Sequence, residues 1–177
     1  MGTLYLVATP IGNLEDISAR ALRILEQVNL IAAEDTRVTR KLLSHFDLHS
    51  RLVSYFEHNK LSKLDAILAQ LDTGDVALVS DAGTPGLNDP GYELVQAALD
   101  AGHRVSPIPG PASPVAALTA SGLPTDSFLF LGYLPRRSTE RQAALSRVAS
   151  LPYTLKKFGS QENTAPSQEK TSRMASR

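Results

Sequence analysis

The sequence predicts an α/β protein with a parallel sheet, followed by the start of a second α/β domain. Short apolar runs suited to buried strands recur at residues 4–8, 30–33, 52–55, 76–79 and 105–108. The segments between them are long enough for helices. Parallel strands need crossover connections, which are usually helical, so this alternation indicates a parallel sheet with helices on its faces.

The crossovers themselves have helical periodicity. In the first, Asp16 precedes apolar residues spaced along one helical face over 17–25, which predicts an amphipathic helix capped by Asp16. The clearest pattern places four leucines on one face of residues 60–71. A further helix is expected over residues 92–101, with Gly102 as its C-terminal cap.

The pattern changes after residue 121, which we take as the end of an N-terminal domain over residues 1–121. Residues 122–126, Gly-Leu-Pro-Thr-Asp, read as a linker. Strand and helix patterns resume over residues 127–158, the expected start of an incomplete second α/β domain. Residues 159–177 contain no Val, Ile, Leu, Phe, Tyr or Trp, so we expect a disordered tail.

Composition excludes several classes of protein. With 18 basic and 18 acidic residues the net charge is zero, so RNA would be bound through a local patch and not by a general attraction. The absence of cysteine excludes disulfides, thiolate nucleophiles and Cys-based zinc sites. No apolar run approaches the roughly 20 residues that span a membrane, so we expect a cytoplasmic protein without membrane association.

Three Gly- and Pro-rich segments follow strands of the expected sheet, where ligands of such sheets bind. The first includes Pro10 and Gly12, although a simple turn into a helix would use the same residues. The second, residues 80–91, exceeds the two to six residues typical of a strand-to-helix connection. The third is residues 109–113. Their convergence at one edge of one sheet predicts a small-molecule site.

Residues 34–37, Glu-Asp-Thr-Arg, combine two acids, a hydroxyl and a base at the end of the second strand. The carboxylates of Glu34 and Asp35 would suit a substrate hydroxyl or a cationic cofactor, and Arg37 would suit a phosphate. A helix N-cap surrounded by surface charges explains the same residues equally well. Sequence alone leaves both interpretations open.

Other familiar signatures are absent. The chain has no Gly-x-Gly-x-x-Gly after its first strand, no P-loop, no His-Glu-x-x-His and no Gly-x-Ser-x-Gly. No metal site is expected, because the histidines lack ligand spacing and are expected on the surface or in loops: His45, His49, His58 and His103. Arg136 and Arg137 form a small basic cluster, either a solvated helix start or an RNA phosphate contact.

Five ordered motifs resemble the ribosomal RNA small subunit methyltransferase I family, within the tetrapyrrole methylases. They are Val-Ala-Thr-Pro-Ile-Gly-Asn-Leu at 7–14, Glu-Asp-Thr-Arg at 34–37, Ser-Asp-Ala-Gly-Thr-Pro at 80–85, Asp-Pro-Gly at 89–91 and Pro-Gly-Pro at 109–111. The resemblance implies a class III methyltransferase fold that uses S-adenosylmethionine in a homodimer. It implies 2′-O-methylation of a cytidine ribose in 16S rRNA of the small ribosomal subunit.

The resemblance also implies which residues act. Donor-binding residues would be Pro10, Gly12, Ser80, Asp81, Ala82, Gly83, Thr84, Pro85, Pro109, Gly110, Pro111 and Ala112. By their location at the strand ends, and not by the resemblance, the candidates for the base that assists the ribose hydroxyl are Glu34, Asp35 and Asp81, among which the sequence does not choose. Candidates for RNA contacts are Arg37, Arg136 and Arg137.

The family pattern stops after residue 155, where the family would continue with about another hundred residues. We interpret the polar tail as a frameshift, an early stop or an altered gene model, and expect impaired activity if the truncation is real. Two alternatives remain from sequence: a methylase of a tetrapyrrole or other small molecule, and a noncatalytic donor-binding fragment.

Overall fold

The structure, a computed structural model, describes residues 1–56 and 60–158. It divides into two compact units, Met1–Thr125 and Asp126–Arg177. The division falls inside the segment expected as a linker, while the finer domain boundaries stay predictions. The disordered tail predicted at 159–177 lies outside the described residues.

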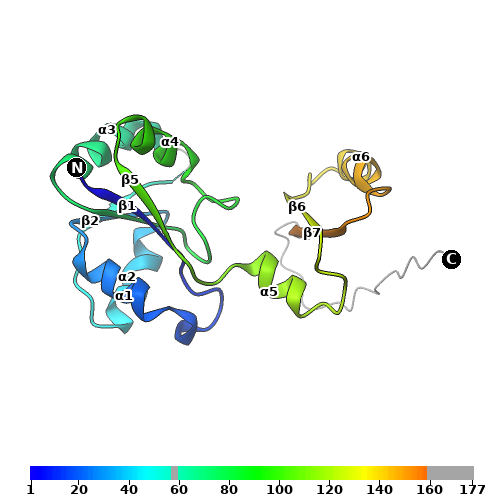
Figure 1. Cartoon of the computed structure of the whole chain (residues 1–177), viewed down its shortest axis with the longest axis horizontal. Helices are drawn as coiled ribbons and strands as arrows, with labels where there is room; N and C mark the ends of the chain where they lie inside the picture. Colours follow the sequence, from blue (N-terminus) through cyan, green and yellow to red (C-terminus); the bar gives the residue numbers. More distant parts are fainter. Residues whose placement is uncertain (57–59, 159–177) are drawn as a thin grey trace. The chain divides into compact units, whose positions relative to one another are not determined.

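The first unit is built on a five-stranded sheet in which every pairing is parallel, which confirms the predicted α/β class (Figure 1). The strand order is β3-β2-β4-β1-β5. The strands are β1 (Thr3–Val7), β2 (Leu30–Ala33), β3 (Leu52–Ser54), β4 (Val76–Val79) and β5 (Arg104–Ile108).

Helices cover both faces of this sheet. α1 (Ala19–Gln27) and α2 (Thr36–His45) lie on one face, and α3 (Lys60–Thr73) and α4 (Tyr92–Asp100) lie on the other (Figure 1). α5 (Ser113–Thr119) follows β5.

The central strands are buried on both sides. Alternate residues of β2 point to opposite faces, Ile31 and Ala33 toward the α1 and α2 cluster and Leu30 and Ala32 toward the α3 and α4 cluster. All four residues of β2 and of β4 are buried. Continuous apolar runs are therefore the correct sequence signal for this sheet.

The start of α1 differs from the prediction. Its cap is Ser18, whose hydroxyl accepts a hydrogen bond from the Ala21 N–H at 3.1 Å. The expected cap, Asp16, instead lies in a short 3-10 turn, η1 (Leu14–Asp16), where its N–H donates to the Asn13 carbonyl. A local turn with its own cap, Asn13, thus separates the strand exit from the helix.

The prediction of surface or loop positions for the histidines is confirmed for His45 and His49, which are exposed, and for His103, which lies in the loop between α4 and β5 although its side chain is buried. His103 is buried because the turn at Gly102 brings the chain back under the α3 and α4 layer, and its Nε2 lies 3.6 Å from Asp72. His58 lies outside the described residues.

Chain connectivity opens a crevice at the carboxyl edge of the sheet. After β1 and β2 the chain continues into α1 and α2 on one face, whereas after β4 it continues into α4 on the other. Because β4 lies between β2 and β1, the exits of neighbouring strands diverge there. Such switch points are where open α/β sheets bind ligands.

The second unit contains β6 (Phe128–Tyr133), α6 (Ser138–Val148) and β7 (Thr154–Phe158). The two strands pair in parallel, so strand, helix and strand form a βαβ unit. Within the described residues, no helix is both long enough and apolar enough to cross a bilayer.

Candidate functional site

Hydrogen bonds join the three Gly- and Pro-rich segments of the first unit. The Thr9 N–H donates to the Gly83 carbonyl at 2.8 Å, and the Gly83 N–H donates back to the Thr9 carbonyl at 3.0 Å. The Thr84 hydroxyl then donates to the Pro111 carbonyl at 3.1 Å. The predicted convergence of the segments after β1, β4 and β5 is thus present as direct contact between them.

The segment after β4 follows a path that glycine permits. Gly83 has φ +86°, and Gly91 has φ +154°, both in the region that L side chains rarely adopt. A Cβ on Gly91 would lie only 2.9 Å from the Leu78 Cδ2. A side chain at position 91 would therefore require the Leu78 side chain to move.

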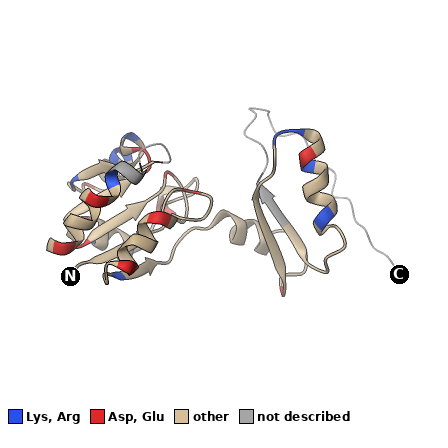
Figure 2. Cartoon of the chain, turned by 90° about the horizontal axis from the view of Figure 1, so that it is seen from above, with Lys and Arg blue, Asp and Glu red and all other residues tan. Residues whose placement is uncertain are grey.

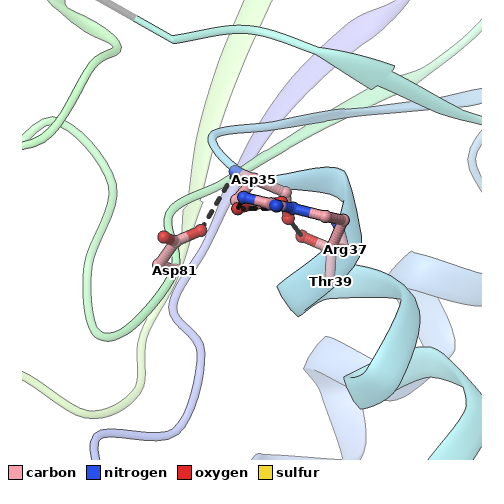
Figure 3. A network of polar contacts seen from close by, with 4 residues as sticks. All are labelled: Asp35, Arg37, Thr39 and Asp81. Carbon is pink, nitrogen blue, oxygen red and sulfur yellow. Dashed lines mark hydrogen bonds and ion pairs between the residues drawn. The ribbon is translucent and has the colours of Figure 1, made fainter.

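The acidic residues at the ends of β2 and β4 contact one another across the crevice. The Asp35 N–H donates to Asp81 Oδ1 at 3.0 Å (Figure 3). The Asp81 N–H in turn donates to Glu34 Oε2 at 3.1 Å. The two strand exits are therefore held together by reciprocal bonds between backbone and carboxylate. This arrangement brings together all three carboxylates that the sequence proposed.

Asp35 stabilises the start of α2. Its carboxylate caps α2 by accepting the Arg37 N–H at 2.8 Å, and it also accepts the Arg37 guanidinium, with Nη2 to Oδ2 at 2.6 Å (Figure 3). The side-chain hydrogen bonds from Arg37, followed by the backbone bond, lower the pKa of Asp35 to about 2. The helix-cap interpretation is thus correct for Asp35, and so low a pKa makes it a poor base.

Glu34 and Asp81 are perturbed in the opposite direction. Burial raises the pKa of the Glu34 carboxyl, and the neighbouring charges of Asp81, Asp89 and Asp35 add to the shift, against the hydrogen bond from the Asp81 N–H. Burial also raises the pKa of Asp81, against the hydrogen bond from the Asp35 N–H. Carboxyls with raised pKa values suit proton transfer near neutral pH.

Asp89 joins this group, although the sequence analysis did not place it among the site residues. Burial raises the pKa of its carboxyl, an effect opposed by the Ser80 hydroxyl and increased by the charge of Asp81. Ser80 itself is buried, and its hydroxyl lies near Asp89 without the geometry of a full hydrogen bond. Asp89 lies in the Asp-Pro-Gly motif at 89–91, which could have indicated a site residue. The same motif is also typical of a simple turn, so the sequence did not distinguish the two.

Three cavities lined by described residues border this edge of the first unit. The β1 cavity, about 200 Å³, lies between the exits of β1 and β4 and α2, lined by Thr9, Pro10, Leu14, Val38, Thr39, Lys41, Leu42, Ser80 and Asp81. The β3 cavity, about 400 Å³, is lined by Glu34, Asp35, Thr36, Arg37, Ser54 and Phe56. The α4 cavity, about 320 Å³, is lined by Leu6, Leu78, Pro85, Gly86, Leu87, Gly91, Tyr92 and Val95.

These cavities include some of the predicted donor-binding residues and not others. Pro10, Ser80 and Asp81 line the β1 cavity and Pro85 lines the α4 cavity, whereas Gly83, Thr84 and Pro111 connect the segments. The remaining ones lie on the same segments: Gly12, Ala82, Pro109, Gly110 and Ala112. Phe56 and Ser54 were missed, although the carboxyl-end argument applies equally to β3.

Arg136 and Arg137 belong to the second unit and precede α6, along which Figure 2 shows charges of both signs. Arg137 is 82% exposed and lies 3.4 Å from Glu140, and the Arg141 guanidinium donates to the Arg136 carbonyl. An exposed pair of this kind contributes little stability, which leaves these side chains available for other contacts.

The family described as Tetrapyrrole (Corrin/Porphyrin) Methylases matches residues 3–166. The chain belongs to this family. The match covers the strand exits and carboxylates described above and extends into the second unit. It confirms the family relationship that the five motifs indicated.

Curated relatives of this chain are named as ribosomal RNA methyltransferases. A ribosomal RNA small subunit methyltransferase I from Halalkalibacterium halodurans is 56% identical over 155 residues, 87% of this chain and 54% of that protein. A similar protein of the same name from Escherichia coli O157:H7 is 52% identical over 155 residues, with the same coverage of both chains. The chain therefore spans about half the length of these curated relatives.

The fold also resembles solved methylase structures. A uroporphyrin-III C-methyltransferase from Thermus thermophilus has a TM-score of 0.56 at 28% identity, over 75% of this chain and 60% of that one. This likeness confirms the class III fold expected from the sequence.

Proposed function

We propose that this chain carries the donor site and the catalytic carboxylates of an S-adenosylmethionine-dependent methyltransferase that methylates a cytidine ribose 2′-hydroxyl in 16S rRNA. The observation that carries the proposal is the pair of hydrogen bonds that link Asp81 to Asp35 and to Glu34 where the exits of β2 and β4 diverge. It stands in a chain more than half identical to enzymes named for ribosomal RNA methylation.

The crevice fits a cationic methyl donor. The sulfonium of S-adenosylmethionine carries a positive charge, and the carboxyls of Glu34, Asp81 and Asp89 give this edge an acidic lining. The hydrogen bonds of Thr9, Gly83 and Thr84 hold the backbones of three strand exits together at this edge. We assign donor binding to these segments, as the motifs suggested.

The reaction requires alignment and one proton acceptor. The ribose 2′-oxygen forms a bond to the methyl carbon as the carbon–sulfur bond breaks, the sulfur keeps that electron pair, and the hydroxyl proton passes to a base. Glu34 is our choice for this base and Asp81 its positioning partner, because the Asp81 N–H holds Glu34 Oε2 at 3.1 Å. Asp35 is set aside, since Arg37 already occupies its carboxylate.

The proposed partner is the small ribosomal subunit, which places the protein in the cytoplasm. Arg37, Arg136 and Arg137 are the candidates for contacts with RNA phosphates. The homodimer expected from the family resemblance is part of the same proposal.

The first test is calorimetric titration of the 177-residue chain with S-adenosylmethionine and S-adenosylhomocysteine, followed by transfer of labelled methyl to small subunits that lack the modification. One donor site per chain and label on a cytidine 2′-oxygen are expected. A folded chain that binds no donor, or label carried only by a uroporphyrin-like acceptor, would refute the proposal.

The role of Glu34 is tested in the same assay. Glu34→Gln keeps a hydrogen-bond acceptor for the Asp81 N–H but removes the base, so the transfer rate is expected to fall by about 10²- to 10⁴-fold with donor affinity unchanged. Glu26→Gln, on the exposed surface of α1, is the matched control and should transfer like the wild type. An unchanged rate in Glu34→Gln would contradict the assignment.

A further inference from the structure

The β3 cavity differs from the other two in its chemistry. It combines an aromatic ring, a guanidinium, a hydroxyl pair and carboxylates in about 400 Å³, within the range of about 300 to 1,000 Å³ found for small-ligand pockets. The β1 and α4 cavities are lined mainly by apolar side chains and the segments already assigned to the donor. The lining of the β3 cavity therefore suits a ligand other than the methyl donor.

Phe56 supplies the aromatic wall of this cavity. Leu52 packs against the α1 and α2 cluster while Tyr55 is fully buried in the opposite cluster, so by alternation Ser54 and Phe56 lie on the side of Leu52. Phe56 is 37% exposed. A partly exposed ring beside polar groups is the surface on which proteins stack unpaired bases of RNA.

Arg37 lines the β3 cavity with a guanidinium that is fixed by hydrogen bonds to Asp35. Its bonds to Asp35 use Nε and Nη2, and the side chain is 83% exposed (Figure 3). Because the pairing fixes the plane of the group, its Nη1 edge is presented to solvent in a defined direction. A phosphate oxygen is the natural partner of such an edge.

Glu34 connects the β3 cavity to the donor crevice. Its side chain lines the cavity, and its Oε2 accepts a hydrogen bond from Asp81, which lines the β1 cavity. A nucleoside placed in the β3 cavity thus lies beside the carboxyl assigned as the base.

We infer that the β3 cavity binds the acceptor nucleotide of a single-stranded RNA segment, with its base against Phe56 and a phosphate at Arg37. This inference rests on the proposed function. The adenosine of the donor has the same stacking chemistry but no phosphate, so Arg37 favours the acceptor. The acceptor base must then leave its helical stack, as in other enzymes that act on a single nucleotide.

The test measures RNA binding without catalysis. A fluorescein-labelled, short single-stranded oligocytidylate is titrated with the full chain by anisotropy, and donor affinity is measured separately by calorimetry. Phe56→Leu is expected to weaken oligonucleotide binding by about 5- to 150-fold, the value of one base stacked on an aromatic ring. Phe56→Tyr should bind the oligonucleotide like the wild type. The control variant Leu99→Ala should do so too, because Leu99 is an exposed apolar residue at the C-terminal end of α4 and does not line the β3 cavity.

The outcomes separate this inference from the proposed function. Unchanged oligonucleotide binding in Phe56→Leu overturns the acceptor site, as does a wild-type chain that binds donor but no oligonucleotide, and both leave donor binding intact. Weakened donor affinity in Phe56→Leu, with oligonucleotide binding unchanged, would assign the cavity to the donor adenosine and overturn the inference. Loss of oligonucleotide binding in Phe56→Leu supports it even if methyl transfer fails.

Discussion

Replacing Gly91 with alanine is expected to destabilise the first unit more than the same replacement at Gly12. The two glycines share an unusual backbone, with φ +154° at Gly91 and +150° at Gly12. They differ in surroundings: a Cβ at Gly91 would lie 2.9 Å from Leu78 Cδ2 and 3.3 Å from the Gly86 nitrogen, whereas a Cβ at Gly12 would have nothing within 4 Å.

The magnitude follows from separating the two effects. Both variants bear the backbone cost of an unfavourable conformation, about 1–3 kcal/mol. Only Gly91→Ala also crowds Leu78, which is 1% exposed and packed in the α3 and α4 cluster, and overpacking of this kind costs about a further 1–3 kcal/mol. The difference between the variants therefore isolates the steric contribution.

Urea unfolding followed by circular dichroism measures that difference. With a slope of about 2 kcal/mol per molar urea, the midpoint of Gly91→Ala should lie roughly 0.5–1.5 M below that of Gly12→Ala. Equal midpoints would show that the segment after β4 does not approach Leu78 as closely as described, and the reasoning about its path would fail.

Three further predictions concern hydrogen bonds and charges. Thr84→Val removes the bond to the Pro111 carbonyl, so stability should fall by about 0.5–1.5 kcal/mol and donor binding should weaken, with both restored in Thr84→Ser; equal behaviour of the two variants would contradict this. The pKa of Asp35 is about 2, below its ordinary 3.8, so its stabilisation is complete above the ordinary value and is lost as pH falls through 2. The wild type should therefore unfold at higher urea than Asp35→Asn at pH 7, with the gap closing toward pH 2; a gap independent of pH would count against the pairing. Replacing Arg136 and Arg137 with glutamine should lower the slope of log affinity against log salt for single-stranded RNA by about 0.7 per lost phosphate contact, and an unchanged slope would remove these residues from the interface.

Local sequence patterns were sufficient where a single property decided the structure. The runs at 30–33 and 76–79 match β2 and β4 because strands buried on both faces must be apolar at every position. The Gly- and Pro-rich segments could likewise be assigned to one edge, because all carboxyl ends of parallel strands meet there.

Other features depend on which strands pair, and this information is not local. The contact of Asp35 with Asp81 exists because β4 lies beside β2, although the two residues are 46 positions apart. The choice among Glu34, Asp35 and Asp81 likewise required the Arg37 contact and the burial of the other two carboxyls. The cap of α1 was misplaced for a smaller reason. Both Asp16 and Ser18 are good cap residues, and the sequence did not show that Asp16 belongs to the η1 turn.

The central position of β4 also sets the timing of folding. β1 pairs with β4 and β5, and β4 begins at Val76, so the first strand made during synthesis has to wait for a partner far along the chain. At about 5–20 residues per second, that interval is roughly 4 to 14 seconds. Neighbouring β2 and β3 can pair much sooner, but the sheet closes only when β4 inserts between two strands that are already synthesised. Folding of the first unit is therefore expected to be slow and cooperative, and its nascent apolar strands are a target for chaperones during that time.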